Sequence, residues 1–233
     1  MKKYTFEDFA EIIKMLRSEN GCPWDKEQTH ESLKPCMTEE AYELLSAINI
    51  YYKSGYYENM REELGDILLQ VVMHSQIAAE EDLFSVEDVI QEICEKMIRR
   101  HPHVFGDVIA KDSEKVLTNW DDIKNKEKEG KEWIASPLRE IPGEFPSLIR
   151  APKVLKKIDQ LYTPMKTYEG SVKTIIEESE NLTLLSLEQE TVKLEKSLGN
   201  ILMELSNISR LKRIPLEQLL SDKLEELIND CEQ

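Results

Sequence analysis

Two acidic stretches, Glu39-Glu40-Ala41-Tyr42-Glu43 and Glu62-Glu63-Leu64-Gly65-Asp66, lie inside apolar runs that are typical of helices. With about 100° between successive helical residues, the second acid of each stretch borders the apolar stripe of its helix. The last acid lies one turn further along the same border, whereas the first acid turns away. We therefore predict two helices that present matching i, i+3 pairs of carboxylates beside a buried seam. These four acids are Glu40, Glu43, Glu63 and Asp66.

Four carboxylates at the edge of a core raise one another's pKa, and burial raises it further. They can all stay ionised only if a positive charge lies nearby. Mg²⁺ would supply it, with Mn²⁺ as a substitute, because such hard cations prefer oxygen ligands. One stretch alone is more typical of a solvated acidic face, but two with the same geometry favour a metal site. A di-iron bundle would need two Glu-x-x-His pairs. Only Glu27 and His30 have that spacing, in a segment without helical periodicity.

The composition of the 233-residue chain indicates an all-α protein. Hydrophobic residues make up 40% of it and aromatic residues only 7%, and Leu, Glu, Lys and Ile dominate. The net charge of −16 argues against a nucleic-acid duplex or an anionic membrane as partner. It does not exclude a small polyanion that arrives with Mg²⁺, because the metal reverses the local sign.

The chain shows no sign of export or membrane insertion. No apolar run approaches the ~20 residues of a membrane span, and we see no signal-peptide core near Met1. The four cysteines lack Cys-x-x-Cys spacing, so we expect reduced thiols in a cytoplasmic protein. They are Cys22, Cys36, Cys94 and Cys231.

Apolar periodicity and capping signals predict helices on both sides of a proline-rich region. The expected helices span about 6–16, 36–54, 57–80, 86–101, 113–129, 168–185, 188–211 and 215–230. Asn20 to Asp25 is expected to form a rigid turn. The helix over 57–80 is apolar almost all round beyond Asp66, which predicts burial in a bundle or a dimer interface. Close backbone approach would explain Gly65 inside it.

Four prolines between 137 and 152 mark a domain boundary. We therefore expect tandem helical-bundle domains over 1–135 and 136–233.

A basic group lies near the end of the helix over 86–101. Lys96 and Arg100 are i, i+4 neighbours, with Arg99 beside them. Such a group is either a solvated helix end or a phosphate clamp in which arginine binds bidentately. Further along, Trp120 and Lys124 have the same spacing; the tryptophan would be a packing anchor or a surface on which a base stacks. The nearby His101 and His103 are more typical of plain loop residues than of metal ligands.

The second half of the chain echoes the first. Residues 196–202 align with 62–68, and residues 176–182 align with 38–44. The apolar frame and the glycine survive, but three of the four candidate ligands are replaced by neutral residues, which cannot balance a dication. We therefore predict a helical duplication whose second copy binds no metal. The replacements are Asn181 for Glu43, Ser197 for Glu63 and Asn200 for Asp66.

Three motifs together resemble the MazG family of nucleoside triphosphate pyrophosphohydrolases. They are Gly21-Cys22-Pro23-Trp24-Asp25, the paired acidic stretches, and Arg99-Arg100-His101-Pro102-His103-Val104-Phe105. The length is similar to that of the long, two-domain form of the family, which forms dimers. The eroded second copy is a departure, because in long-form members that domain can carry the activity.

The resemblance implies Mg²⁺-dependent hydrolysis of an NTP or dNTP to the monophosphate and pyrophosphate. By motif position, Glu40, Glu43, Glu63 and Asp66 would hold metal. Lys96, Arg100 and Lys124 would contact phosphates, and Trp120 the base. Glu39 would orient the attacking water. The alternative is a non-catalytic, dimeric all-α module that binds nucleotide or regulates a partner.

Overall fold

The computed structural model describes residues 2–106, 123, 127, 136–184 and 191–232. Every regular element in these ranges is a helix, which confirms the expected all-α class. The chain divides into two compact units, Met1–Lys128 and Glu129–Gln233. The assignment of residues 1–135 as a catalytic domain and 136–233 as its degenerate copy stays a prediction. None of the described helices is long and apolar enough to cross a membrane.

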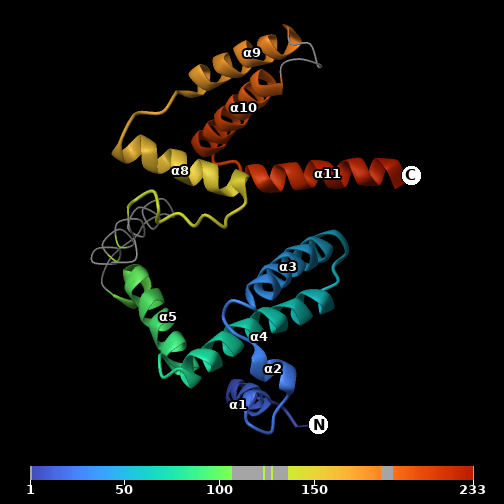
Figure 1. The fold of residues 1–233 in the computed structure, drawn as a ribbon, viewed down its shortest axis with the longest axis vertical. Helices are drawn as coiled ribbons and strands as arrows, with labels where there is room; N and C mark the ends of the chain where they lie inside the picture. Colours follow the sequence, from blue (N-terminus) through green and yellow to red (C-terminus); the bar gives the residue numbers. More distant parts are fainter. Residues whose placement is uncertain (1, 107–122, 124–126, 128–135, 185–190, 233) are drawn as a thin grey trace. The chain divides into compact units, whose positions relative to one another are not determined.

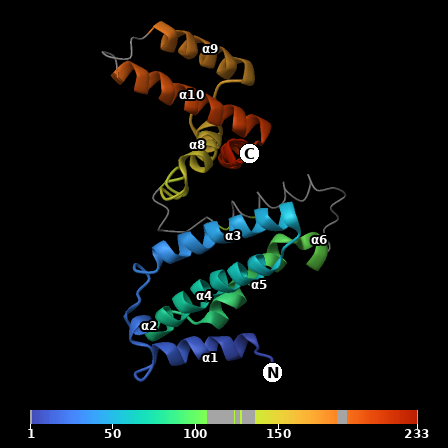
Figure 2. The same ribbon diagram turned by 90° about the vertical axis from the view of Figure 1, so that its right-hand side faces the viewer.

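Unit 1 is built around two long antiparallel helices. The helices described in it are α1 (Phe6–Arg17), α2 (Pro23–Glu27), α3 (Lys34–Ser54), α4 (Glu58–Glu80), α5 (Val86–Arg100) and α6 (Pro102–Phe105). Helices α3 and α4 run side by side, and α1 lies against α4 (Figures 1 and 2). The buried cluster between these elements comprises Ile13, Leu33, Val72, Met73, Ile77 and Val86. The core therefore sits toward the C-terminal half of α4, and the N-terminal half of α4 contributes no residue to this buried cluster.

Local signals in the sequence set several helix ends. Thr5 and Ser85 cap α1 and α5 in reciprocal capping boxes with Asp8 and Asp88, as the sequence predicts. Gly55 ends α3 at a φ of 79°, a left-handed conformation that favours glycine. That turn sends the chain back along α3 as α4.

The turn after α1 contains the short helix α2, which the sequence-based expectation of a plain turn missed. Pro23 occupies the first helical position, where its lack of an N–H costs nothing. Gly21 approaches the preceding helix so closely that an added Cβ would lie 2.1 Å from the carbonyl oxygen of Leu16. The turn is therefore tight at its start and helical beyond it.

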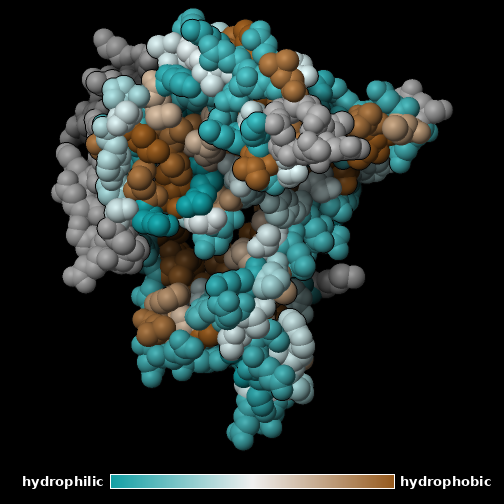
Figure 3. All heavy atoms as spheres, turned by 45° about the horizontal axis from the view of Figure 1, so that its top comes forward, coloured by the Kyte–Doolittle hydropathy of each residue, from teal (hydrophilic) through white to brown (hydrophobic). Residues whose placement is uncertain are grey.

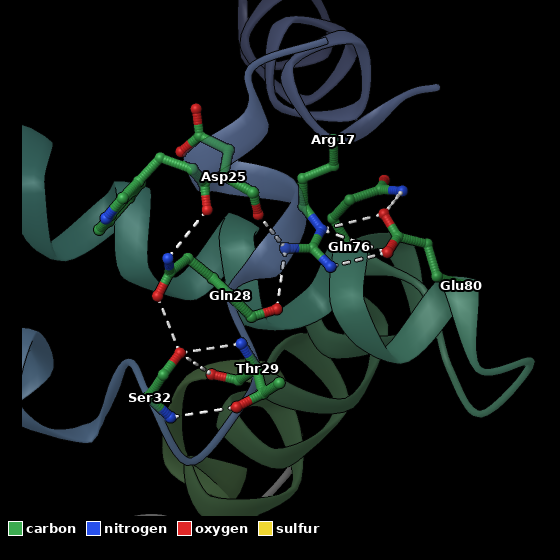
Figure 4. A network of polar contacts seen from close by, with 8 residues as sticks. Arg17, Asp25, Gln28, Thr29, Ser32, Gln76 and Glu80 are labelled. Atoms are coloured by element: carbon green, nitrogen blue, oxygen red, sulfur yellow. Dashed lines mark hydrogen bonds and ion pairs between the residues drawn. The ribbon is translucent and has the colours of Figure 1, made fainter. Parts of the chain in front are cut away.

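Arg17 fixes this turn to α4 (Figure 4). Its side chain is only 5% exposed. Nε and Nη2 donate to the carboxylate of Glu80 at 2.8–3.2 Å, and Nη1 donates to the carbonyl oxygens of Asp25 and Gln28. One guanidinium thereby joins α1, the α2 turn and α4, and it sets the path of the chain into α3.

Two expectations about special residues were wrong. Among the described residues, a Cβ at Gly65 would meet nothing within 4 Å, so close backbone approach by them does not account for that glycine. The proline-rich region was expected to contain no helix, but α8 (Ser147–Leu161) begins in it and includes Pro152. Pro152 is the sixth residue of α8, where its missing N–H removes one backbone hydrogen bond without ending the helix, and treating every proline as a breaker hid α8.

Unit 2 consists, where described, of α8, α9 (Tyr168–Leu184), α10 (Thr191–Lys212) and α11 (Leu216–Glu232). Helices α9 and α10 form an antiparallel pair (Figure 1). Several of its most buried side chains are polar. Asn207 is 1% exposed and donates to the hydroxyl of Ser171, which donates to the carboxylate of Glu204. Unit 2 is thus held partly by satisfied hydrogen bonds in place of apolar packing.

Candidate active site

The α3–α4 pair brings together three of the predicted acids. One carboxylate oxygen from each of Glu40, Glu43 and Glu63 lies within 4.8 Å of the others. Glu40 and Glu43 are one helical turn apart on α3, and Glu63 faces them from the first part of α4. The antiparallel pairing of the two helices therefore brings three of the four predicted acids together.

The carboxylates of this cluster oppose one another's ionisation. Partial burial raises the pKa of Glu40, and the negative charges of Asp66, Glu43, Glu63 and Glu39 raise it further. The pKa of Glu63 is also raised, first by desolvation and then by Glu43 and Asp66. Asp66 is thus close enough to act on both groups, although it is not one of the three acids within 4.8 Å.

The donor set suits a hard divalent cation. All the candidate ligand atoms are carboxylate oxygens, which Mg²⁺ and Mn²⁺ prefer. The negative charges of these carboxylates repel one another, and a bound cation would neutralise them. Sequence reasoning missed one neighbour, Asn59, whose amide donates to Glu63 at 3.3 Å. Its i, i+4 spacing from Glu63 on α4 was a usable signal.

Glu39 and Glu62 are exposed, in agreement with the prediction that they turn away from the seam. Glu39 nevertheless adds its negative charge to the field at Glu40. It is therefore placed at the rim of the cluster and not within it.

The basic residues at the end of α5 meet a carboxylate that the sequence did not single out. Glu127 accepts from Nε and Nη2 of both Arg99 and Arg100, at 2.5–3.0 Å. These contacts, with that of Arg100 the largest, lower the pKa of Glu127 to about 2. Lys96 lies one turn earlier and has a long 3.9 Å contact with Glu92.

The structure does not join the basic group to the acidic cluster within one chain. Helix α5 leaves the C-terminal end of α4 and runs away from the α3–α4 pair, so its last turn lies apart from the N-terminal end of α4 (Figure 1). Trp120 and Lys124, the predicted base and phosphate contacts, lie outside the described residues. Nδ1 of His101 donates to the carbonyl oxygen of Met97 at 2.6 Å, and the Nδ1 atom of His103 is buried without a described partner.

In unit 2, the corresponding positions form a hydrogen-bonded group in place of a carboxylate cluster. Glu178, the counterpart of Glu40, accepts from the Ser197 hydroxyl at 2.7 Å and from the Asn200 amide at 2.6 Å. These hydrogen bonds, the one from Ser197 first, lower the pKa of Glu178, whereas burial and then like charges raise the pKa of Glu40. The neutral side chains therefore stabilise the lone carboxylate without a cation.

An all-helical chain with a carboxylate cluster on two paired helices has the layout of a metal-dependent hydrolase. Comparisons with known proteins agree. Residues 28–105 match the MazG nucleotide pyrophosphohydrolase domain. The chain is 41% identical to the nucleoside triphosphate pyrophosphohydrolase/pyrophosphatase MazG of Thermotoga maritima, over 96% of this chain and 86% of that relative. The chain belongs to the MazG nucleotide pyrophosphohydrolase family.

Two further relatives show how the likeness is distributed. The nucleoside triphosphate pyrophosphohydrolase of Escherichia coli K12 is 38% identical over 85% of this chain and 75% of its own length. The uncharacterized protein YabN of Bacillus subtilis is 51% identical over 153 residues, which are 66% of this chain but only 30% of YabN.

Proposed function

We propose that this protein hydrolyses nucleoside triphosphates, NTP or dNTP, to the monophosphate and pyrophosphate, with Mg²⁺ as its cofactor. The observation that carries the proposal is the cluster of Glu40, Glu43 and Glu63, with Asp66 beside it, in a chain of the MazG family. A cytoplasmic role in the nucleotide pool fits the four free cysteines.

Each candidate residue has a proposed role. The carboxylates of Glu40, Glu43, Glu63 and Asp66 would hold the metal, since their mutual repulsion favours a bound cation. Bound Mg²⁺ would neutralise phosphate oxygens and activate a water for in-line attack, most simply at the α-phosphorus. Glu39 sits at the rim and would orient that water.

The basic end of α5 would hold the phosphates of the substrate. Lys96 contributes a point charge and Arg100 a planar fork of donors. Lys124 would add a further phosphate contact, and Trp120 would stack on the base. Because metal binding offsets the net negative charge locally, the acidic character of the chain does not oppose a polyphosphate.

We also propose that the active form is a homodimer. Apolar side chains on the α3–α4 pair remain uncovered in one chain: Tyr42, Leu45 and Leu64 are 54%, 52% and 51% exposed. Figure 3 shows apolar side chains reaching the surface in several patches between hydrophilic ones. The distance of the α5 end from the acidic cluster gives a second reason, because a partner chain could supply the basic residues that one chain keeps apart.

The test is a turnover assay on purified full-length protein with a panel of NTPs and dNTPs and Mg²⁺. Product analysis must separate pyrophosphate from orthophosphate. We expect monophosphate and pyrophosphate in equal amounts, and no turnover without divalent metal. Nucleotide binding without any hydrolysis would instead support the non-catalytic module, and orthophosphate release would mean a different reaction.

A further inference from the structure

Arg99 and Arg100 are successive residues on α5, yet both guanidinium groups meet one carboxylate. Successive helical residues point about 100° apart and do not normally share a partner. Here Oε1 of Glu127 lies 2.8 Å from Nε and 2.7 Å from Nη2 of Arg99. Its other oxygen, Oε2, accepts a hydrogen bond from Nε of Arg100 at 3.0 Å. The carboxylate therefore draws two diverging side chains to one place.

The edges used in these contacts matter for what the arginines can still do. Arg99 pairs with Glu127 through Nε and Nη2, so its Nη1 takes no part in that pairing. Among the described side chains of this group, two guanidinium groups and one carboxylate together carry one net positive charge. A polyphosphate is attracted to such a group, and phosphate oxygens match the planar donors of arginine.

Burial divides the three side chains into a fixed part and an accessible part. Glu127 and Arg100 are 13% and 15% exposed, whereas Arg99 is 50% exposed. The pKa of Glu127 lies near 2, so its charge is present throughout the neutral range. A permanently charged, mostly buried carboxylate thus anchors both arginines, and the outer one faces solvent.

We propose that Glu127 is the positioning residue of a two-arginine phosphate clamp, in which Arg99 is the second arm beside Arg100. The inference rests on the proposed function, since the ligand it assigns is the triphosphate of that substrate. Glu127 acts through the arginines by fixing their heads side by side and by offsetting their mutual repulsion. Without it, the two guanidinium groups would separate, and ordering them would cost part of the binding free energy.

The test uses calorimetry of the full-length protein with inorganic triphosphate and Mg²⁺ as the probe. Glu127→Gln removes the charge, Glu127→Asp keeps it on a shorter side chain, and Arg99→Gln removes the second arm. Glu80→Gln is the matched control, because Glu80 also accepts two donors from one arginine but in the Arg17 contact. Circular dichroism on each variant shows whether it is folded.

We expect Glu127→Gln and Arg99→Gln to weaken triphosphate binding about tenfold, the loss of about one charge-assisted hydrogen bond. Glu127→Asp should recover part of the affinity, and Glu80→Gln should bind as the wild type does. In turnover, Glu127→Gln should raise KM for the nucleotide more than it lowers kcat. A purely structural role would instead lower stability and leave triphosphate affinity unchanged.

Three results would overturn this inference. Unchanged affinity in Glu127→Gln and Arg99→Gln would remove both residues from the clamp. Tighter binding in Glu127→Gln would mean that the carboxylate competes with phosphate. A wild type that does not bind triphosphate would mean that no clamp exists. If the wild type hydrolyses nucleotides and Glu127→Gln binds normally, only this inference fails. If triphosphate binding depends on Glu127 but no nucleotide is hydrolysed, only the proposed function fails.

Discussion

Individual carboxylates in unit 1 are held where their charges conflict. Glu40 and Glu63 both have a raised pKa, and the causes named for each are burial and the neighbouring acids. Each of these negative charges is repelled by its neighbours in the metal-free folded state, and the unfolded chain avoids that repulsion. A site that binds a cation tightly is therefore expected to weaken the protein when the cation is absent.

Glu63→Gln separates function from stability at this site. Turnover should fall by at least about 100-fold, because a ligand charge is lost. The metal-free variant should nonetheless melt at a higher temperature than the metal-free wild type, since one repelling charge is gone. Added Mg²⁺ should raise the Tm of the wild type and have little effect on the variant. Melting curves with and without Mg²⁺, together with pyrophosphate release, check this. Undiminished pyrophosphate release would remove Glu63 from the site.

Two histidines of unit 1 lie so close together that a proton on one opposes a proton on the other. Nδ1 of His30 and Nδ1 of His74 are 2.7 Å apart, and their rings are stacked with centroids at 5.0 Å. Only one proton can lie between the two nitrogens. Burial, and then the charge of His30, lowers the pKa of His74 from its ordinary value of 6.5. The contact joins the segment before α3 to the middle of α4.

The pH dependence of stability follows from this pair. The folded state disfavours a proton on His74, so its contribution is fully present above the ordinary pKa and is lost as the pH falls through 6.5 and below. The wild type should therefore lose more stability between pH 7.5 and 5.5 than His74→Gln does. Urea unfolding midpoints at the two pH values measure the difference. Equal losses in both proteins would show that the pair does not control the transition.

At the scale of elements, the helix pairs α3–α4 and α9–α10 bring corresponding positions together, but they surround the shared glutamate position with different side chains. In the first pair, Glu40 faces other carboxylates. In the second, Glu178 accepts hydrogen bonds from Ser197 and Asn200. Neutral donors stabilise one carboxylate, but they cannot offset the dehydration of a dication. The same helical frame therefore supports a charged site in one unit and a hydrogen-bonded site in the other.

Paired substitutions test the difference between the two helix pairs. Glu178→Gln should leave turnover and metal binding within about twofold of the wild type, as is usual for a change away from the chemistry. Glu40→Gln, at the counterpart position, should abolish turnover. Metal titration by calorimetry should show the same contrast. If Glu178→Gln removes as much activity or bound metal as Glu40→Gln, the second unit does hold a metal site.

The reverse substitutions provide a gain-of-function test. Installing Asn181→Glu, Ser197→Glu and Asn200→Asp together should add a metal-binding site to the chain, because it restores the full carboxylate set on α9 and α10. Calorimetry should then report additional bound metal relative to the wild type. An unchanged stoichiometry in a folded variant would show that the frame of unit 2 no longer fits a cation.

For the whole molecule, the exposed apolar side chains of α3 and α4 predict self-association. Leu64→Glu with Leu68→Glu should convert a dimer into a monomer, because charges in a contact surface lose their hydration. Light scattering at micromolar concentration measures the mass, and activity should fall with it if a partner completes the site. Leu184→Glu is the control, since Leu184 is 83% exposed and lies outside α3 and α4. A wild-type mass of one chain would contradict the dimer.

The sequence alone determined the helical class, most helix ends and the acidic cluster, because each depends on short-range patterns. The i, i+3 spacing of Glu40 and Glu43 placed them on one face, and the matching pattern around Glu63 identified the facing helix. Capping boxes at Thr5 and Ser85 likewise depend on four residues each. Helix α8 was missed because the presence of Pro152 outweighed the local pattern.

Only the tertiary structure decided which distant groups meet. Glu127 is 27 residues from Arg100, His30 is 44 residues from His74, and Arg17 is 63 residues from Glu80. Periodicity fixes the face on which a side chain lies but not the path of the chain between helices. That path depends on turns, buried contacts and loop closure summed over the whole unit, so the partners of Glu127, His74 and Arg17 had to be read from the fold.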